Sequence, residues 1–317
     1  MVISKKVYSA SHEDVIRQFE MKNKPSIRLS AEDQTLQELV QYALKMAFKD
    51  FNFRTLHKVR IEEDKDTSVL DEKLRELKKE KGEEVTVTAY LMEHLGKKFE
   101  SRFVKYFQGE SLSKEEFDRW HHETCQLFLD NLDGTGEYEG LCKIYRNLNY
   151  GKAQKIVNMM FKHLYCFQSE ENWKTRWEPY FRHCHVTLDN FTLEWFRRQV
   201  PPNQRIDSWS NLVYLKTPMD KNDYLFYQTN IRKFFDEQKG TSSIYRDVTP
   251  FQAEFYIWPE IQLHLAAEAF VFELNPDDYR GKESDPTNKR ADIIKLPVEE
   301  LIAVVMQEIQ KHKDKLR

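Results

Sequence analysis

The chain is poor in glycine, with 9 among 317 residues. Many tight turns and phosphate-cradling loops depend on glycine, because other residues adopt their backbone conformations only with strain. The sequence also lacks the motifs of dinucleotide-binding proteins (GxGxxG), P-loop enzymes (GxxxxGK[ST]) and serine hydrolases (GxSxG). These absences argue against three large classes of enzyme.

Cysteine and long apolar runs are scarce as well. The four cysteines lie far apart, without the density of a disulfide scaffold: Cys125, Cys142, Cys166 and Cys184. No apolar run approaches the length that crosses a bilayer, and the start, Met1–Lys6, lacks the apolar core of a secretory signal. We therefore expect a reduced, cytoplasmic protein with no membrane partner.

One segment lacks carboxylates altogether. No Asp or Glu occurs between Glu139 and Glu170, although 32% of all residues are charged. The basic residues of this window are Lys143, Arg146, Lys152, Lys155, Lys162 and His163. Since the formal net charge is -3, a cationic segment of this length predicts an anionic partner, with a nucleic-acid backbone first. A break at Leu148–Gly151 divides the window into two expected helices, 141–149 and 152–167.

Most other segments also predict helices, so we expect a mainly α, multi-helix globular protein. Capping residues and apolar periodicity place further helices at about 30–47, 85–107, 113–128, 190–199, 223–238, 250–272 and from 297 to 311. A small extended element is expected near the N-terminus, at 53–63. We expect a helical region of unknown role at 1–110 and a helical domain at 111–317, which contains the helix-hairpin-helix-like segment 141–167.

The candidate catalytic residues are lysines and one aspartate. On the helix after Gly151, positions 152, 155, 159 and 162 share one stripe, and three of them are lysines. The residues expected in the core are Ile156, Val157, Met160, Phe161 and Leu164. Lys155 thus lies on an otherwise apolar helix, where partial burial and neighbouring cations lower an amine's pKa, as a lysine nucleophile requires. Asp189 begins a later helix, where backbone donors keep a carboxylate ionised.

These residues resemble the helix-hairpin-helix DNA glycosylases, and most of all the archaeal 8-oxoguanine glycosylase branch. The resemblance covers about residues 141–199 and is carried by Gly151, Gln154–Val157, Lys162 and Val186–Asp189. It implies that hairpin amides hold a DNA phosphate, that Lys155 attacks C1′ of a flipped-out nucleotide, and that Asp189 assists departure of the base. The residues expected to contact nucleic acid are Asn149, Gly151, Lys152, Lys162, Arg146 and Arg198. No cofactor is expected.

The chain departs from this family's pattern in three ways. Asn149 stands where the first hairpin glycine is expected, although Asn tolerates the left-handed conformation. Lys155 follows Gly151 by four residues, later than in commoner members, which makes Lys152 a competing nucleophile. The chain as a whole is also not basic.

Other interpretations stay open. The chain fits a non-catalytic helical binding or effector protein, for instance of bacterial or phage defence, that holds nucleic acid, a nucleotide or an acidic partner on window 141–169. Lys155 is then a surface lysine, and Asp189 a plain N-cap. Two His/Cys groups, His121-His122 with Cys125 and His183-Cys184-His185, are either zinc ligands of a nuclease or packed side chains.

Two further features have a structural and a functional interpretation. Trp209, Tyr214, Tyr224 and Tyr227 form either a stacking wall for a base or part of the core. Glu254, inside an apolar helix, needs a basic partner such as Arg146 or Arg198 unless it belongs to the site. The sequence leaves open which base is removed, whether the substrate is duplex or single-stranded, and the oligomeric state.

Overall fold

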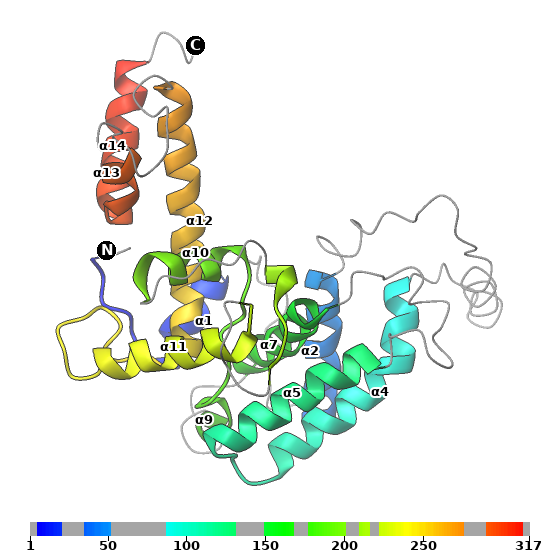
Figure 1. Cartoon of the computed structure of the whole chain (residues 1–317). Coiled ribbons are helices and arrows are strands. Elements are labelled where there is room, and N and C mark those ends of the chain that lie inside the picture. Colours follow the sequence, from blue (N-terminus) through cyan, green and yellow to red (C-terminus); the bar gives the residue numbers. More distant parts are fainter. Residues whose placement is uncertain are drawn as a thin grey trace. The chain divides into compact units, whose positions relative to one another are not determined.

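The computed structural model describes residues 5–20, 35–51, 87–130, 149–167, 177–200, 209–215, 222–275 and 290–312. Within these ranges the chain is mainly helical and has no strand, apart from an isolated parallel bridge between Val213 and Asp223 (Figure 1). The prediction of a mainly α protein is confirmed. The element expected at 53–63, the helix expected at 141–149 except Asn149, and Arg146 lie outside the described residues.

Contacts divide the chain into two compact units. Unit 1 comprises Met1–Lys24, Asp189–Arg205 and Tyr227–Arg317, and unit 2 comprises Pro25–Leu188 and Ile206–Phe226. Both units are therefore built from segments that are distant in the sequence. Neither has a boundary at residue 110.

Unit 2 is organised around one buried helix. Its described helices are α2 (Leu36–Phe51), α4 (Val87–Gln108), α5 (Lys114–Asp130), α7 (Tyr150–Cys166), α9 (Glu178–Phe181) and the 3₁₀ turn η4 (Trp209–Asn211). Helix α7 packs against α2, α5 and η4, and α2 also packs against α4. Because neighbours cover α7 on several sides, the residues that we expected in its core are all buried, at 0–1% exposure.

Helix α5 begins where its capping residues predict. The Ser113 N–H donates to Glu116 Oε2 over 2.9 Å, and the Glu116 N–H donates to Ser113 Oγ over 3.4 Å. This reciprocal pair satisfies the backbone N–H groups of both residues at the first turn of the helix. The apolar side of α5 then packs Phe117 against Phe161 of α7, with ring centroids 5.6 Å apart. The capping box thus sets where α5 starts to cover α7.

Unit 1 is organised around α12. Its described helices are α1 (His12–Glu20), α10 (Asn190–Gln199), most of α11 (Tyr224–Gln238), α12 (Pro250–Leu274), α13 (Arg290–Lys295) and α14 (Val298–Lys311). Helix α12 contacts α1, α10, α13 and α14, and Figure 1 shows α13 and α14 beside its C-terminal half. Thr249 caps α12 in a box with Gln252, and Pro250 occupies its first position, where no backbone donor is needed.

An aromatic stack joins the start of the chain to α12. Tyr8 is 1% exposed and stacks on Tyr256 at a centroid distance of 4.4 Å, and its hydroxyl donates to Glu260 over 2.6 Å. Burial, together with the charge of Glu260, raises the pKa of Tyr8 well above its usual value, so the hydroxyl stays a donor. In the described part of the chain, no helix is both long enough and apolar enough to span a membrane.

Candidate functional site

The first turn of α7 begins at Asn149. This residue is extended, with φ -147° and ψ 174°, and its side-chain oxygen accepts a hydrogen bond from the Lys152 backbone N–H over 3.1 Å. Asn149 is therefore an N-cap, a position at which Asn is strongly preferred. Asn149 does not adopt the left-handed conformation that we expected at the first glycine position of a helix-hairpin-helix motif.

Gly151 is needed for a close approach between two segments. A Cβ atom at this position would lie 2.0 Å from the Trp209 carbonyl oxygen of η4, a distance that no side chain tolerates. The absence of a side chain at Gly151 therefore allows η4 to rest directly on α7. Residues far apart in the sequence are brought together here, and Trp209 becomes a neighbour of the α7 lysines.

Lys152 lies in the first turn of α7 and is 7% exposed. Burial lowers the pKa of its amine. Among the residues that the structure describes, no carboxylate pairs with this amine. The positive end of the helix dipole also disfavours a cation in the first turn. Both effects favour the neutral amine.

Lys155 lies one turn further and is half-buried. Its Nζ is 5.3 Å from the centroid of the Trp209 ring, within the range of a cation–π interaction. Lys162, two turns beyond, is buried at 5% exposure. All three lysines of the predicted stripe thus lie on α7, and Lys155 contacts Trp209 of η4.

Asp189 is the N-cap of α10. Its Oδ1 accepts from the backbone N–H groups of Phe191 and Thr192 over 2.9 and 3.2 Å, and its Oδ2 accepts from Trp258 Nε1 over 2.8 Å. The carboxylate is 7% exposed, and Thr192 completes a capping box. Asp189 belongs to unit 1, whereas Lys155 belongs to unit 2. The two residues of the predicted catalytic pair thus belong to different units.

Arg198 is held inside unit 1. Its side chain is 3% exposed, and it donates to Glu194 over 2.6 Å and to Glu268 over 2.7 Å. Burial opposes ionisation of Glu268, but hydrogen bonds from His264 and Arg198 and their charges hold the pKa of this carboxyl below its usual value. Because the guanidinium of Arg198 is buried in these ion pairs, little of its surface is accessible to a phosphate. Its acidic partners are Glu194 and Glu268, and Glu254 is not one of them.

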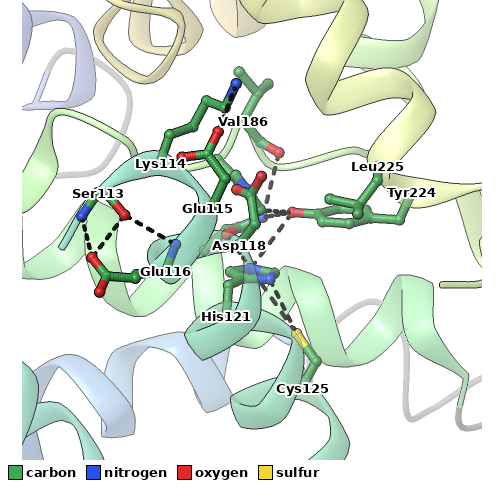
Figure 2. A network of polar contacts seen from close by, with 12 residues as sticks. Ser113, Lys114, Glu115, Glu116, Asp118, His121, Cys125, Val186, Tyr224 and Leu225 are labelled. Atoms are coloured by element: carbon green, nitrogen blue, oxygen red, sulfur yellow. Dashed lines mark hydrogen bonds and ion pairs between the residues drawn. The ribbon is translucent and has the colours of Figure 1, made fainter. Parts of the chain in front are cut away.

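A buried polar network lies between α5, α7 and the start of α11, all within unit 2 (Figure 2). The imidazole of His185 contacts Asp118 through Nε2 over 2.7 Å and the Tyr224 hydroxyl through Nδ1 over 2.9 Å. His121 Nε2 contacts Asn158 Oδ1 over 2.8 Å. Because carboxylate and amide oxygens only accept, we assign the proton to Nε2 of both histidines. Tyr224 then donates to His185 Nδ1.

Two amides of α7 complete this network, and neither was a candidate in its own right. Asn158 Nδ2 donates to Gln154 Oε1 over 2.9 Å and to the Tyr224 hydroxyl over 3.1 Å, and Gln154 Nε2 donates to the Leu188 carbonyl over 2.8 Å. Both amide side chains are fully buried. The signal that could have found them is their spacing, since two amides four residues apart on an apolar helix face point to a shared network.

The His/Cys groups take part in packing. His121 contacts the Cys125 thiol, and His185 belongs to the network above. His122 stacks on Tyr214 with ring centroids 3.6 Å apart, and burial lowers its pKa. Nowhere in the described ranges do three or more His, Cys, Asp or Glu side chains gather so that they could hold a metal ion.

The four aromatic residues of the expected stacking wall divide into two kinds. Tyr224 and Tyr227 are fully buried, at 0% exposure. Trp209 and Tyr214 are half-buried, and they flank the short segment 209–215 in unit 2. Of the four rings, these two keep exposed surface, and His122 stacks on one face of Tyr214.

Comparisons of this chain with family models, with curated proteins and with solved structures find no match.

Proposed function

We propose that this protein binds nucleic acid at the start of α7 and excises a modified base, with a lysine amine of α7 as the nucleophile. The observation that carries the proposal is the state of Lys152. Lys152 lies in the first turn of a helix, is 7% exposed and pairs with no described carboxylate, and burial lowers the pKa of its amine, so its surroundings favour the deprotonated form that a nucleophile needs. Lys155 and the rest of the acid-free window supply positive charge for the phosphates.

The chemistry needs a target base that has left the stack. The neutral amine attacks C1′ of the flipped-out nucleotide, a C1′–N bond forms, the N-glycosidic bond breaks, and the base leaves with a proton. The nitrogen gives one proton to the departing base and then expels the ring oxygen O4′, which takes up the second N–H proton, so an imine is left between lysine and the opened sugar. Borohydride reduces such an imine to a stable amine, so the covalent intermediate can be isolated.

Lys152 and Lys155 are the two candidates for this step. The resemblance implies Lys155, and the lowered pKa of Lys152 favours Lys152. The ammonium of Lys155 has a favourable position over the Trp209 ring, which stabilises its charged form. We therefore propose Lys152 as nucleophile and Lys155 as a phosphate contact.

Borohydride trapping with a panel of oligonucleotides that carry modified bases or abasic sites tests this proposal. We expect a covalent adduct with the wild type and with Lys155→Met, and none with Lys152→Met. Met keeps the length and apolar stem of lysine, so circular dichroism should show an unchanged helix content in both variants. An adduct with Lys152→Met and none with Lys155→Met would instead identify Lys155 as the nucleophile. No adduct and no base release across the panel would rule out the enzyme.

A second candidate is a non-catalytic nucleic-acid-binding protein, and the bonding of Asp189 favours it. Both carboxylate oxygens of Asp189 already accept hydrogen bonds inside unit 1, which is a sufficient structural role. Asp189→Asn separates the two functions, because Asn keeps the N-cap to Phe191 and Thr192; it loses the acceptor for Trp258 Nε1, so urea denaturation is the control for stability. The excision proposal expects loss of base release with binding kept. If the protein only binds nucleic acid, we expect Asp189→Asn to leave the affinity for nucleic acid unchanged. Replacing Lys152 or Lys155 should then lower this affinity in a graded way.

A further inference from the structure

Trp209 is less buried than the core aromatic residues of unit 2. Its side chain is half-buried, whereas rings such as Phe117, Phe161 and Tyr224 are fully buried in aromatic clusters. In the described part of the chain, no other ring stacks on its indole, and no residue accepts a hydrogen bond from its Nε1. A tryptophan that is fixed but has no aromatic partner has a ring face to offer.

The backbone of Trp209 is held in place from two directions. Its carbonyl oxygen rests against Gly151 of α7, and the same oxygen accepts a hydrogen bond from the Leu212 N–H over 3.3 Å. The segment that follows is fixed by Val213, whose N–H donates to the Asn222 carbonyl over 2.9 Å and whose carbonyl accepts from the Tyr224 N–H over 2.8 Å. The indole therefore sits on a rigid support, and a ligand that stacks on it orders little of the protein.

The amine of Lys155 lies beside the indole ring of Trp209. Lys155 Nζ lies 5.3 Å from the indole centroid, and Lys155 is half-buried. Proteins that bind single-stranded nucleic acid combine these two elements, an aromatic face for the base and a basic group for the adjoining phosphate. The acid-free composition of α7 adds no carboxylate that would repel the phosphate.

We infer that the indole of Trp209 is a stacking platform for one unpaired base of the bound nucleic acid, and that Lys155 contacts the phosphate next to that base. The inference rests on the proposed function, and it specifies the ligand as nucleic acid with an unpaired base at this position. A base inside an intact duplex presents no free face, so single strands and flipped-out nucleotides are the substrates that fit.

Tyr214 provides a matched control. It lies on the same segment, is also half-buried and is also aromatic, but His122 already covers one of its faces at a centroid distance of 3.6 Å. Replacing Tyr214 therefore changes the same region without removing the proposed platform. Since the Trp209 side chain makes no described hydrogen bond, Trp209→Leu should keep the fold, and Trp209→Phe should restore part of the stacking.

The experiment measures the affinity of the full chain for a dye-labelled single-stranded oligonucleotide by fluorescence anisotropy. A second oligonucleotide of the same length, with abasic residues in place of all nucleotides but the labelled one, carries phosphates without bases. We expect Trp209→Leu to weaken binding of the first oligonucleotide by roughly 5- to 150-fold, the range for loss of one stacked base, and to leave the second unchanged. Tyr214→Leu should bind both like the wild type.

Salt separates stacking from charge. Trp209→Leu should weaken binding by the same factor at every salt concentration, whereas Lys155→Gln should make the salt dependence less steep by about one phosphate contact. Equal affinity of Trp209→Leu and wild type for the first oligonucleotide would overturn the platform while leaving nucleic-acid binding intact. An equal loss on both oligonucleotides would also overturn it. A wild type that binds neither would overturn the proposed function and the platform together.

Discussion

At the scale of single residues, Asn158 is the most connected side chain of the buried network. Its Oδ1 faces His121, and its Nδ2 donates to Gln154, to the Val186 carbonyl and to the Tyr224 hydroxyl. These residues are buried, so water does not replace the hydrogen bonds that they make with Asn158. This one amide therefore joins α7 to α5 and to the chain around Val186.

Removing this amide should be costly. We expect Asn158→Ala to lower the free energy of unfolding by about 2–4 kcal/mol, because it removes four hydrogen bonds between buried groups and leaves a cavity in their place. Urea denaturation measures the change. Asn190→Ala, at an exposed position of α10, is the control and should stay within about 0.5 kcal/mol of the wild type. Equal stability of both variants would show that the network contributes little.

Two glycines should respond to the same substitution with opposite sign. Gly151→Ala places a Cβ atom 2.0 Å from the Trp209 carbonyl oxygen, so η4 must move, and we expect a loss of about 1–3 kcal/mol. Gly96 lies inside α4, where a Cβ atom would meet only Leu44 Cδ2 at 3.6 Å. Gly96→Ala should therefore stabilise the protein by about 0.5–1 kcal/mol through helix propensity. Thermal unfolding of the two variants compares the signs directly.

At the scale of helices, a buried ionic cluster connects α10 to α12. Arg198 of α10 pairs with Glu268 of α12, and the side chains are 3% and 7% exposed. His264 of α12 contacts the same carboxylate and, through Nε2, donates to the Leu296 carbonyl just after α13 over 2.9 Å. Helices α10 and α12 thus meet at one carboxylate, and His264 links this cluster to the segment after α13.

Because of this cluster, we expect the free energy of unfolding to depend on pH. The pKa of Glu268 is below its usual 4.5 in the folded protein, so its contribution is complete above that value and is lost as pH falls through the folded pKa. We expect Glu268→Gln to cost about 3 kcal/mol at pH 7, because Arg198 loses a buried partner. Urea denaturation at pH 7 and below pH 4 should show the difference between variant and wild type shrinking with acidification. A difference that is constant over this range would mean that the carboxylate's charge is not what stabilises the cluster.

The sequence predicted those helices whose boundaries are set locally. Ser113 and Glu116 predict the start of α5, and Pro201-Pro202 predict the end of α10 near Gln199. Helix α1 was not predicted, because its nine residues are short for a helix on their own and its partner α12 begins far along the chain. Short helices that exist only against a distant neighbour leave little trace in local periodicity.

The site was predictable only in part, for a similar reason. The acid-free window indicated the lysines of α7, and the capping preference of Asp indicated the position of Asp189. The close approach of Gly151 depends on Trp209, far along the chain, and the pairing of Arg198 depends on Glu268, seventy residues away. Neither contact has a local signal, so neither could be read from the residues beside it.

At the scale of the whole molecule, unit 1 is assembled from both ends of the chain. Tyr8 packs on Tyr256 of α12 and at a centroid distance of 5.3 Å against Tyr245, and α1 also contacts α12. The last helix, α14, packs on α12 as well. The stability of α12 therefore depends on segments that are far apart in sequence.

Removing one side chain of the N-terminal segment should loosen unit 1 selectively. We expect Tyr8→Ala to cost about 3–5 kcal/mol, since it deletes a buried ring, and Tyr8→Phe to cost about 1 kcal/mol, since it removes only the hydrogen bond to Glu260. Hydrogen exchange should report faster exchange in α12 and α14 of Tyr8→Ala, with protection kept in α5 and α7. Uniform loss of protection in both units would show that they unfold together.

This arrangement has a consequence for biosynthesis. Helix α1 leaves the ribosome early, but α12, its packing partner, begins roughly 230 residues later. At ordinary elongation rates of about 5–20 residues per second, α1 waits roughly 10–50 seconds for that partner. Unit 2 is complete once residue 226 has been synthesised, so it can fold while unit 1 still lacks its central helix. During that interval the apolar side of α1, including Val15, is the surface that a chaperone would have to cover.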